Sequence, residues 1–164
     1  MSYRSISSNY EFSYTPEQIW EFLINPETTH KFQKNLCYYV EINSTLKGEK
    51  GESWTEIHNG ESCTGDVVVQ KIEAIEKYKF LKFAGVQTGI KQTITQTLTP
   101  TAEGCEMKEK IVFSPAFSGK FGMTLLSWLM LATGLLARFA KDPEADLHWY
   151  QKLEEALGAK HGKD

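Results

Sequence analysis

The chain has 164 residues, of which 41% are hydrophobic and 24% are charged, and its 18 basic and 21 acidic residues give a formal net charge of -3. This length fits one domain over residues 1–164 with a sizeable core. The slightly acidic balance supplies no general positive field for phosphate backbones, so we do not expect nucleic acid as a partner.

The first predicted elements are a strand and two short helices. Residues 6–14 alternate apolar and polar side chains, which is typical of a half-buried strand. Residues 15–18 (TPEQ) have the spacing of a capping box with proline at the first helical position, which predicts a helix start. The Asn25–Pro26 pair repeats the cap-then-proline pattern, so a second short helix is expected to end near Phe32.

Six further strands are expected, separated by short turns, over residues 35–44, 52–57, 62–75, 78–83, 89–99 and 104–113. The Asn59–Gly60 pair favours a two-residue type I′ hairpin, which predicts Trp54 opposite Gly65. In that register Trp54 shares its inward face with Val67 and Val69, unless a β-bulge reverses the face. Trp54 is therefore a candidate pocket residue.

Alternation in the last two strands predicts three polar side chains on the inner face of the sheet. Gln92 and Gln96 share a face with Ile94, and Glu109 shares a face with apolar residues of the next strand. A loop over residues 101–104 pairs Leu98 with Met107, Gln96 with Glu109, Ile94 with Ile111 and Gln92 with Phe113. An unpaired buried polar group costs about 1–3 kcal/mol, so we expect water or a ligand to reach these side chains. The alternative is that Gln96 and Glu109 only satisfy each other.

A run without formal charge covers residues 121–137. Its 17 residues lie at the lower limit for a membrane span, and its threonine, serine and glycine residues oppose one, so an integral membrane protein is not expected. At 100° per residue the run has two faces. The side expected to border the sheet and a pocket includes Leu125, Trp128 and Leu129. The outer edge, expected to contact a protein partner or a second copy of the chain, includes Met123, Met130 and Leu131.

The remaining residues predict no cofactor and no metal site. The four histidines lack a two-histidine spacing with a carboxylate, and there is no CxxC pair. The three cysteines (Cys37, Cys63 and Cys105) are odd in number and widely spaced, and the first ten residues contain no apolar core of a secretory signal. We therefore expect reduced thiols and a cytoplasmic location.

The order of these elements is strand, two helices, six strands and a long carboxy-terminal helix. With YTPEQIWEFLINPE, IEAIEKYKF, TLTPTAEGCEM and DLHWYQKLEEAL at their places in that order, the chain resembles the START-like (SRPBCC, Bet v 1-like) superfamily, in particular bacterial members of the polyketide cyclase/dehydrase type. The resemblance implies an α+β helix-grip fold, in which a curved seven-stranded antiparallel sheet wraps around the long carboxy-terminal helix. It also implies a cavity for an apolar molecule between sheet and helix.

The functional expectation is binding, and with it transport or sequestration, of a hydrophobic small molecule such as a lipid, polyketide or isoprenoid. The residues expected to contact it are Trp54, Gln92, Ile94, Gln96, Glu109, Leu125, Trp128 and Leu129. One alternative is a cyclase- or dehydratase-type enzyme in which Glu109 acts as acid or base. Another is a co-chaperone-like interaction domain that uses the edge with Met123, Met130 and Leu131.

Overall fold

The fold is an antiparallel sheet with helices on one face. The computed structural model describes residues 4–32, 41–42, 45–58, 66–87, 89–116, 125, 129, 132 and 143–162. Its elements are β1 (Arg4–Phe12), α1 (Pro16–Leu23), α2 (Pro26–Thr29), the 3-10 helix η1 (His30–Phe32), β2 (Glu41–Ile42), β3 (Ser53–His58), β4 (Asp66–Glu76), β5 (Phe80–Gln87), β6 (Ile90–Pro100), β7 (Cys105–Pro115) and α5 (Pro143–His161).

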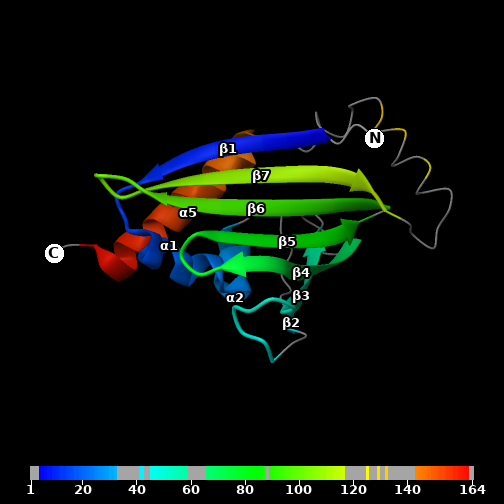
Figure 1. Ribbon diagram of the computed structural model, residues 1–164, viewed down its shortest axis with the longest axis horizontal. Coiled ribbons are helices and arrows are strands. Elements are labelled where there is room, and N and C mark those ends of the chain that lie inside the picture. Colours follow the sequence, from blue (N-terminus) through cyan, green and yellow to red (C-terminus); the bar gives the residue numbers. More distant parts are fainter. Residues whose placement is uncertain are drawn as a thin grey trace.

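The seven strands form one sheet in the order β1-β7-β6-β5-β4-β3-β2, and every neighbouring pair is antiparallel. In Figure 1, α5 crosses the sheet diagonally on its far side, and α1 and α2 lie toward one end of the strands. The predicted α+β helix-grip class, with two short helices between the first two strands, is confirmed.

The start of α1 follows from local side-chain chemistry. Thr15 Oγ1 accepts a hydrogen bond from the backbone N–H of Gln18 at 3.4 Å, and the backbone N–H of Thr15 donates to Gln18 Oε1 at 2.9 Å. Two of the N–H groups that a helix start leaves unpaired are thereby satisfied. The predicted capping box is confirmed.

The core lies between the inner face of the sheet and the helices. Leu153 and Leu157 of α5 are fully buried, one turn apart on the side that meets the sheet. The inner-face side chains packed in the same cluster include Phe12, Trp54, Ile72, Leu81, Leu98, Cys105 and Met107, and α1 adds Ile19, Trp20, Phe22 and Leu23. The register also shifts between Ile72 and Ala74, as at a β-bulge, so that both Ile72 and Ile75 pack inward.

The predicted register between the third and fourth strands is wrong. Trp54 pairs with Gln70 rather than with Gly65, and in the same register His58 lies opposite Asp66. The shift is an odd number of residues, so β4 turns its other face inward. Val67 and Val69 are consequently 59% and 53% exposed on the outer face. The observed register buries alternate residues of β4, namely Val68, Gln70 and Ile72, and this burial favours it.

The charge-free run also requires a correction. Leu125, Leu129 and Ala132 are helical and exposed, and each leucine retains 59% of its surface. We expected Leu125 and Leu129 on the side of the run that borders the sheet, but at this exposure they are not packed in the core. Apolar residues occur all around this run, so the pattern alone does not determine its inner side. Trp128, Met123, Met130 and Leu131 lie outside the described residues. Within the described part of the chain, we find no helix with the length and hydropathy of a membrane span.

Candidate functional site

The inner face of the sheet changes character along the strands. At one end, Leu98 and Met107 are buried against the cluster that holds Leu153 and Leu157. Farther along β6 and β7, the inward side chains of Gln92, Ile94, Glu109 and Ile111 are only half-buried, and beyond them Ile90 and Phe113 are buried again. Polar and apolar groups alternate over this stretch. An inner face of this composition suits a molecule that is mostly apolar and carries a few polar atoms.

The predicted pairing of the last two strands is confirmed. Gln96 lies opposite Glu109, Ile94 opposite Ile111 and Gln92 opposite Phe113. Gln96 Nε2 donates to Glu109 Oε2 at 2.8 Å, and Gln96 is only 5% exposed. The expected alternative, in which Gln96 and Glu109 satisfy each other, therefore holds for the amide nitrogen of Gln96. Glu109 itself is half-buried.

A second polar cluster lies on the inner face of β3 and β4. Trp54 Nε1 donates to Glu56 Oε1 at 2.6 Å, and Gln70 Nε2 donates to Glu56 Oε2 at 3.3 Å. All three side chains are buried, at 6%, 6% and 3% exposure for Trp54, Glu56 and Gln70. The Trp54 ring also lies 5.5 Å from the ring of Phe83, measured between centroids, with the planes tilted by 53°. The Trp54–Glu56–Gln70 cluster thus joins a carboxylate, an amide and an aromatic surface in one place.

Sequence reasoning placed Trp54 correctly on the inner face but missed Glu56 and Gln70. Glu56 shares the strand parity of Trp54, so the same alternation that turns Trp54 inward would have found it. Gln70 was missed because the wrong hairpin register turned Val67 and Val69 inward in its place.

Gly85 makes room for this cluster on the neighbouring strand β5. A Cβ atom placed on Gly85 would lie 2.7 Å from Gln70 Oε1 and 2.7 Å from Val68 Cγ1. Both distances are shorter than van der Waals contact, so a Cβ atom at position 85 would force the side chain of Gln70 or Val68 to move. The amide of Gln70 therefore lies over the backbone of β5 in space that only glycine leaves open.

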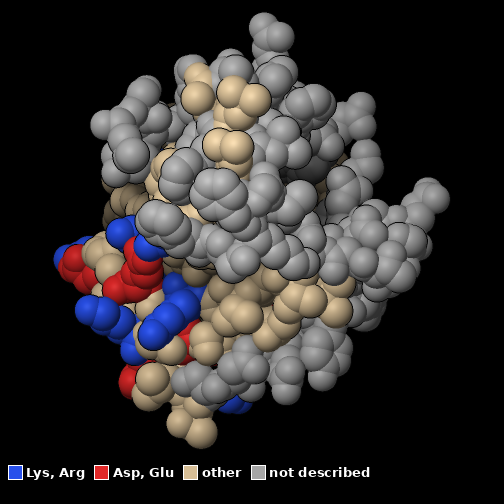
Figure 2. Space-filling view, turned by 90° about the vertical axis from the view of Figure 1, so that its right-hand side faces the viewer, with Lys and Arg blue, Asp and Glu red and all other residues tan. Residues whose placement is uncertain are grey.

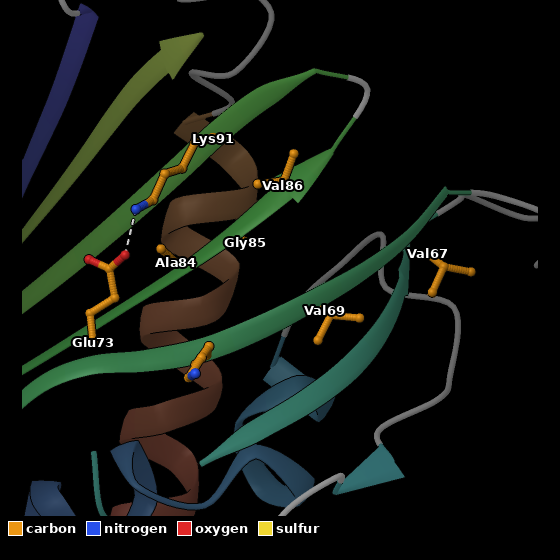
Figure 3. Close-up of a pocket in the computed structure, with 8 residues that line it drawn as sticks. Val67, Val69, Glu73, Ala84, Gly85, Val86 and Lys91 are labelled. Atoms are coloured by element: carbon orange, nitrogen blue, oxygen red, sulfur yellow. Dashed lines mark hydrogen bonds and ion pairs between the residues drawn. The ribbon is translucent and has the colours of Figure 1, made fainter. Parts of the chain in front are cut away.

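The outer face of the sheet carries a shallow hollow of about 360 Å³. Its apolar part is formed by Val67 and Val69 of β4 with Ala84 and Val86 of β5, and its rim by Lys71, Glu73 and Lys91. Figure 3 shows these side chains on the near face of the strands, with α5 on the far face. Val67, Val69 and Val86 are 59%, 53% and 44% exposed, so they form an apolar surface open to solvent.

The charges beside this hollow are largely paired. Glu73 Oε2 lies 3.1 Å from Lys82 Nζ, and Glu73 Oε1 accepts a hydrogen bond from Lys91 Nζ. The hydrogen bond from Lys91, and secondarily that from Lys82, holds the pKa of the Glu73 carboxyl below its ordinary value against the opposing effect of burial. Figure 2 likewise shows basic and acidic side chains intermixed among the residues that it colours. This surface does not present the single positive sign that nucleic acid requires.

Metal and thiol chemistry find little support in the described part of the chain. No group of three histidine, cysteine, aspartate or glutamate side chains there could hold a metal ion. Cys105 is 1% exposed, and burial raises the pKa of its thiol, which makes it unreactive. Cys37 and Cys63 lie outside the described residues.

Comparison with known proteins gives a family and a fold. The model of the family described as "Activator of Hsp90 ATPase homolog 1-like protein" matches residues 13–117, more than half of the chain. A search of curated proteins found no match. Solved structures with the same fold include TTHA0849 from Thermus thermophilus, at 13% identity and a TM-score of 0.69 over 96% of this chain and 99% of that one.

Two further solved structures are similar in fold. Ara h 8.0201 shares 13% identity with a TM-score of 0.65, over 96% of this chain and 99% of that one. A truncated norcoclaurine synthase from Thalictrum flavum shares 12% identity with a TM-score of 0.63, over 99% of this chain and 96% of that one. At these identities the likeness concerns the fold alone. With the family match, the element order and the sheet topology in agreement, the chain belongs to the activator of Hsp90 ATPase homolog 1-like family of the START-like superfamily.

Proposed function

We propose that the protein binds a hydrophobic small molecule, such as a lipid, polyketide or isoprenoid, between the inner face of the sheet and the carboxy-terminal helical region. The observation that carries this proposal is the half-buried stretch of the inner face, where Ile94 and Ile111 alternate with Gln92 and Glu109. A face meant only for packing would bury apolar side chains throughout, as Leu98 and Met107 do a few residues away. The apolar residues would contact the body of the ligand and the polar ones would orient it.

The first experiment is native mass spectrometry of the protein purified from its own host. A copurified apolar molecule is the expected result, and extraction with organic solvent then identifies it. A ligand that is chemically changed on incubation would instead support the enzyme alternative with Glu109 as acid or base. In that case Glu109→Gln should abolish turnover, and unchanged turnover in this variant would exclude that role.

A matched pair of variants tests the position of the ligand. Ile94→Phe adds volume on the inner face, whereas Thr93→Phe adds it on the outer face of the same strand. We expect Ile94→Phe to reduce the copurified ligand at least about tenfold and Thr93→Phe to leave it unchanged, because each 1.4 kcal/mol of lost affinity is a factor of ten. Equal occupancy in both variants would show that the ligand does not lie against β6.

A second function, interaction with a chaperone of the Hsp90 type, is supported by the family description and by the exposed hollow over Val67, Val69 and Val86. An exposed apolar surface with charges at its rim is typical of a protein contact. The test is the ATPase rate of the host's Hsp90-type chaperone with and without this protein. Val69→Lys should abolish any stimulation, and Thr99→Lys, at an exposed site near the other end of the sheet, should not. An unaffected ATPase rate with the unmodified protein would exclude this function.

A further inference from the structure

Gln70 contains a buried oxygen atom that the fold leaves without a donor. Its side chain is 3% exposed, and within the described part of the chain Oε1 has no hydrogen-bond partner. The amide cannot turn around without loss, because Nε2 donates to Glu56 Oε2 at 3.3 Å. The oxygen is therefore held on the side away from Glu56, above Gly85.

Such an atom is costly in a folded protein. A buried acceptor without a donor costs about 1–3 kcal/mol, and the large majority of buried polar side-chain atoms are paired. Replacing Gln70 by an apolar residue of similar size would remove that cost. Instead the fold provides a glycine at position 85 that leaves space for the amide oxygen. This arrangement is explained if a hydrogen-bond donor of a bound ligand reaches Gln70 Oε1.

The surroundings determine which kind of group fits. The indole N–H of Trp54 and an amide N–H of Gln70 both donate to the carboxylate of Glu56. The atom that remains without a partner is an acceptor, so a hydroxyl or N–H group fits it and a carbonyl or ether oxygen does not. Aromatic surface is close by, since the rings of Trp54 and Phe83 are in contact at 5.5 Å. The cluster thus combines an acceptor for a ligand's donor with a wall for a ligand's apolar body.

We propose that the ligand of this protein carries a hydroxyl or N–H group that donates to Gln70 Oε1, and that its apolar body lies along the inner face beside Trp54 and Phe83. This inference rests on the proposed binding function and narrows its ligand class to amphipathic hydrogen-bond donors. Ketones, esters and ethers of the same shape that carry no hydroxyl or N–H group would be poor ligands, because they leave Gln70 Oε1 unpaired.

A matched pair of probes tests this directly. 2-Naphthol and 2-methoxynaphthalene have the same aromatic body and differ in the hydroxyl donor. Their dissociation constants for the full chain are measured by calorimetry. We expect 2-naphthol to bind at least about tenfold more tightly, as a hydrogen bond to a buried acceptor would give.

Variants then locate the donor's partner. Gln70→Leu should equalise the affinities for the two probes, whereas Thr93→Leu, on the outer face of β6, should keep the preference for 2-naphthol. Circular dichroism checks that each variant is folded. The comparison of probes on the unmodified protein stands even if Gln70→Leu does not fold. Equal binding of both probes by the unmodified protein would overturn this inference and leave the proposed function intact. Binding of neither probe would count against both.

Discussion

Gly85→Ala tests the packing on which the Trp54–Glu56–Gln70 cluster depends. Gly85 is not among the glycines with positive φ, so its backbone accepts alanine, and the obstacle is space. The new methyl group would lie 2.7 Å from both Gln70 Oε1 and Val68 Cγ1. One of these groups has to move, and moving the amide breaks its hydrogen bond to Glu56.

The expected cost follows from three contributions. Overpacking of a filled core costs about 1–3 kcal/mol. Loss of the amide–carboxylate hydrogen bond adds about 1 kcal/mol or slightly more. Replacing a strand glycine returns about 0.5–1 kcal/mol of chain entropy. We therefore expect Gly85→Ala to lower the free energy of unfolding by about 1–3 kcal/mol.

Urea unfolding followed by circular dichroism measures this change. Gly158→Ala in α5 is the matched control, because its new Cβ meets only Tyr14 Oη at 3.4 Å, an ordinary contact, and it should be neutral or stabilising. The cost of Gly85→Ala should fall by about 1 kcal/mol when Gln70 is already alanine, since the clash with the amide is then absent. A Gly85→Ala variant as stable as the unmodified protein, or a cost that is the same in both backgrounds, would refute this account of Gly85.

The remaining predictions concern stability. Leu157→Ala should destabilise the protein by about 2–5 kcal/mol because Leu157 is fully buried. Leu125→Ala, at a 59% exposed site, should change stability by less than about 0.5 kcal/mol. Urea unfolding measures both changes, and a larger cost at Leu125 would show that this side chain is packed after all. Thr15→Ala should cost about 0.5–2 kcal/mol by removing the cap of α1, and an unaltered midpoint would show that the cap contributes nothing. The pKa of Glu73 is lowered in the fold, so its stabilisation is present above the pKa of the unfolded chain and lost as pH falls through the folded value. Glu73→Gln should therefore be less stable than the unmodified protein near pH 7, by less than about 1 kcal/mol, and the two should converge toward pH 3; a constant difference across this range would contradict the ion pair with Lys91.

The parts of the fold that the sequence predicts best are those in which neighbouring signals agree. The pairing of β6 and β7 follows from two clear alternations and a short loop, so Gln96 is correctly placed opposite Glu109. The cap at Thr15 is equally local. In both cases all the interacting groups lie within a short stretch of chain, and no distant contact overrides them.

The parts that it misses depend on contacts between distant residues. The turn preference of Asn59 and Gly60 is local, but the register of β3 against β4 is decided by which face of β4 the core buries. That single error exchanged Val69 for Gln70 on the inner face and so concealed half of the candidate site. In the charge-free run, the abundance of apolar residues on all sides hides the orientation of Leu125 and Leu129.

The pairing of the first strand with the last has a consequence for synthesis of the protein on the ribosome. Arg4 lies opposite Phe113, so β1 has no partner until β7 has been made, about a hundred residues later at the usual elongation order from the amino terminus. The apolar face of α1, with Ile19 and Trp20, is covered later still, because it belongs to the cluster that Leu153 and Leu157 of α5 complete. The nascent chain therefore carries apolar surface without its native partners until α5 has been synthesised, and such surface is prone to aggregation during translation.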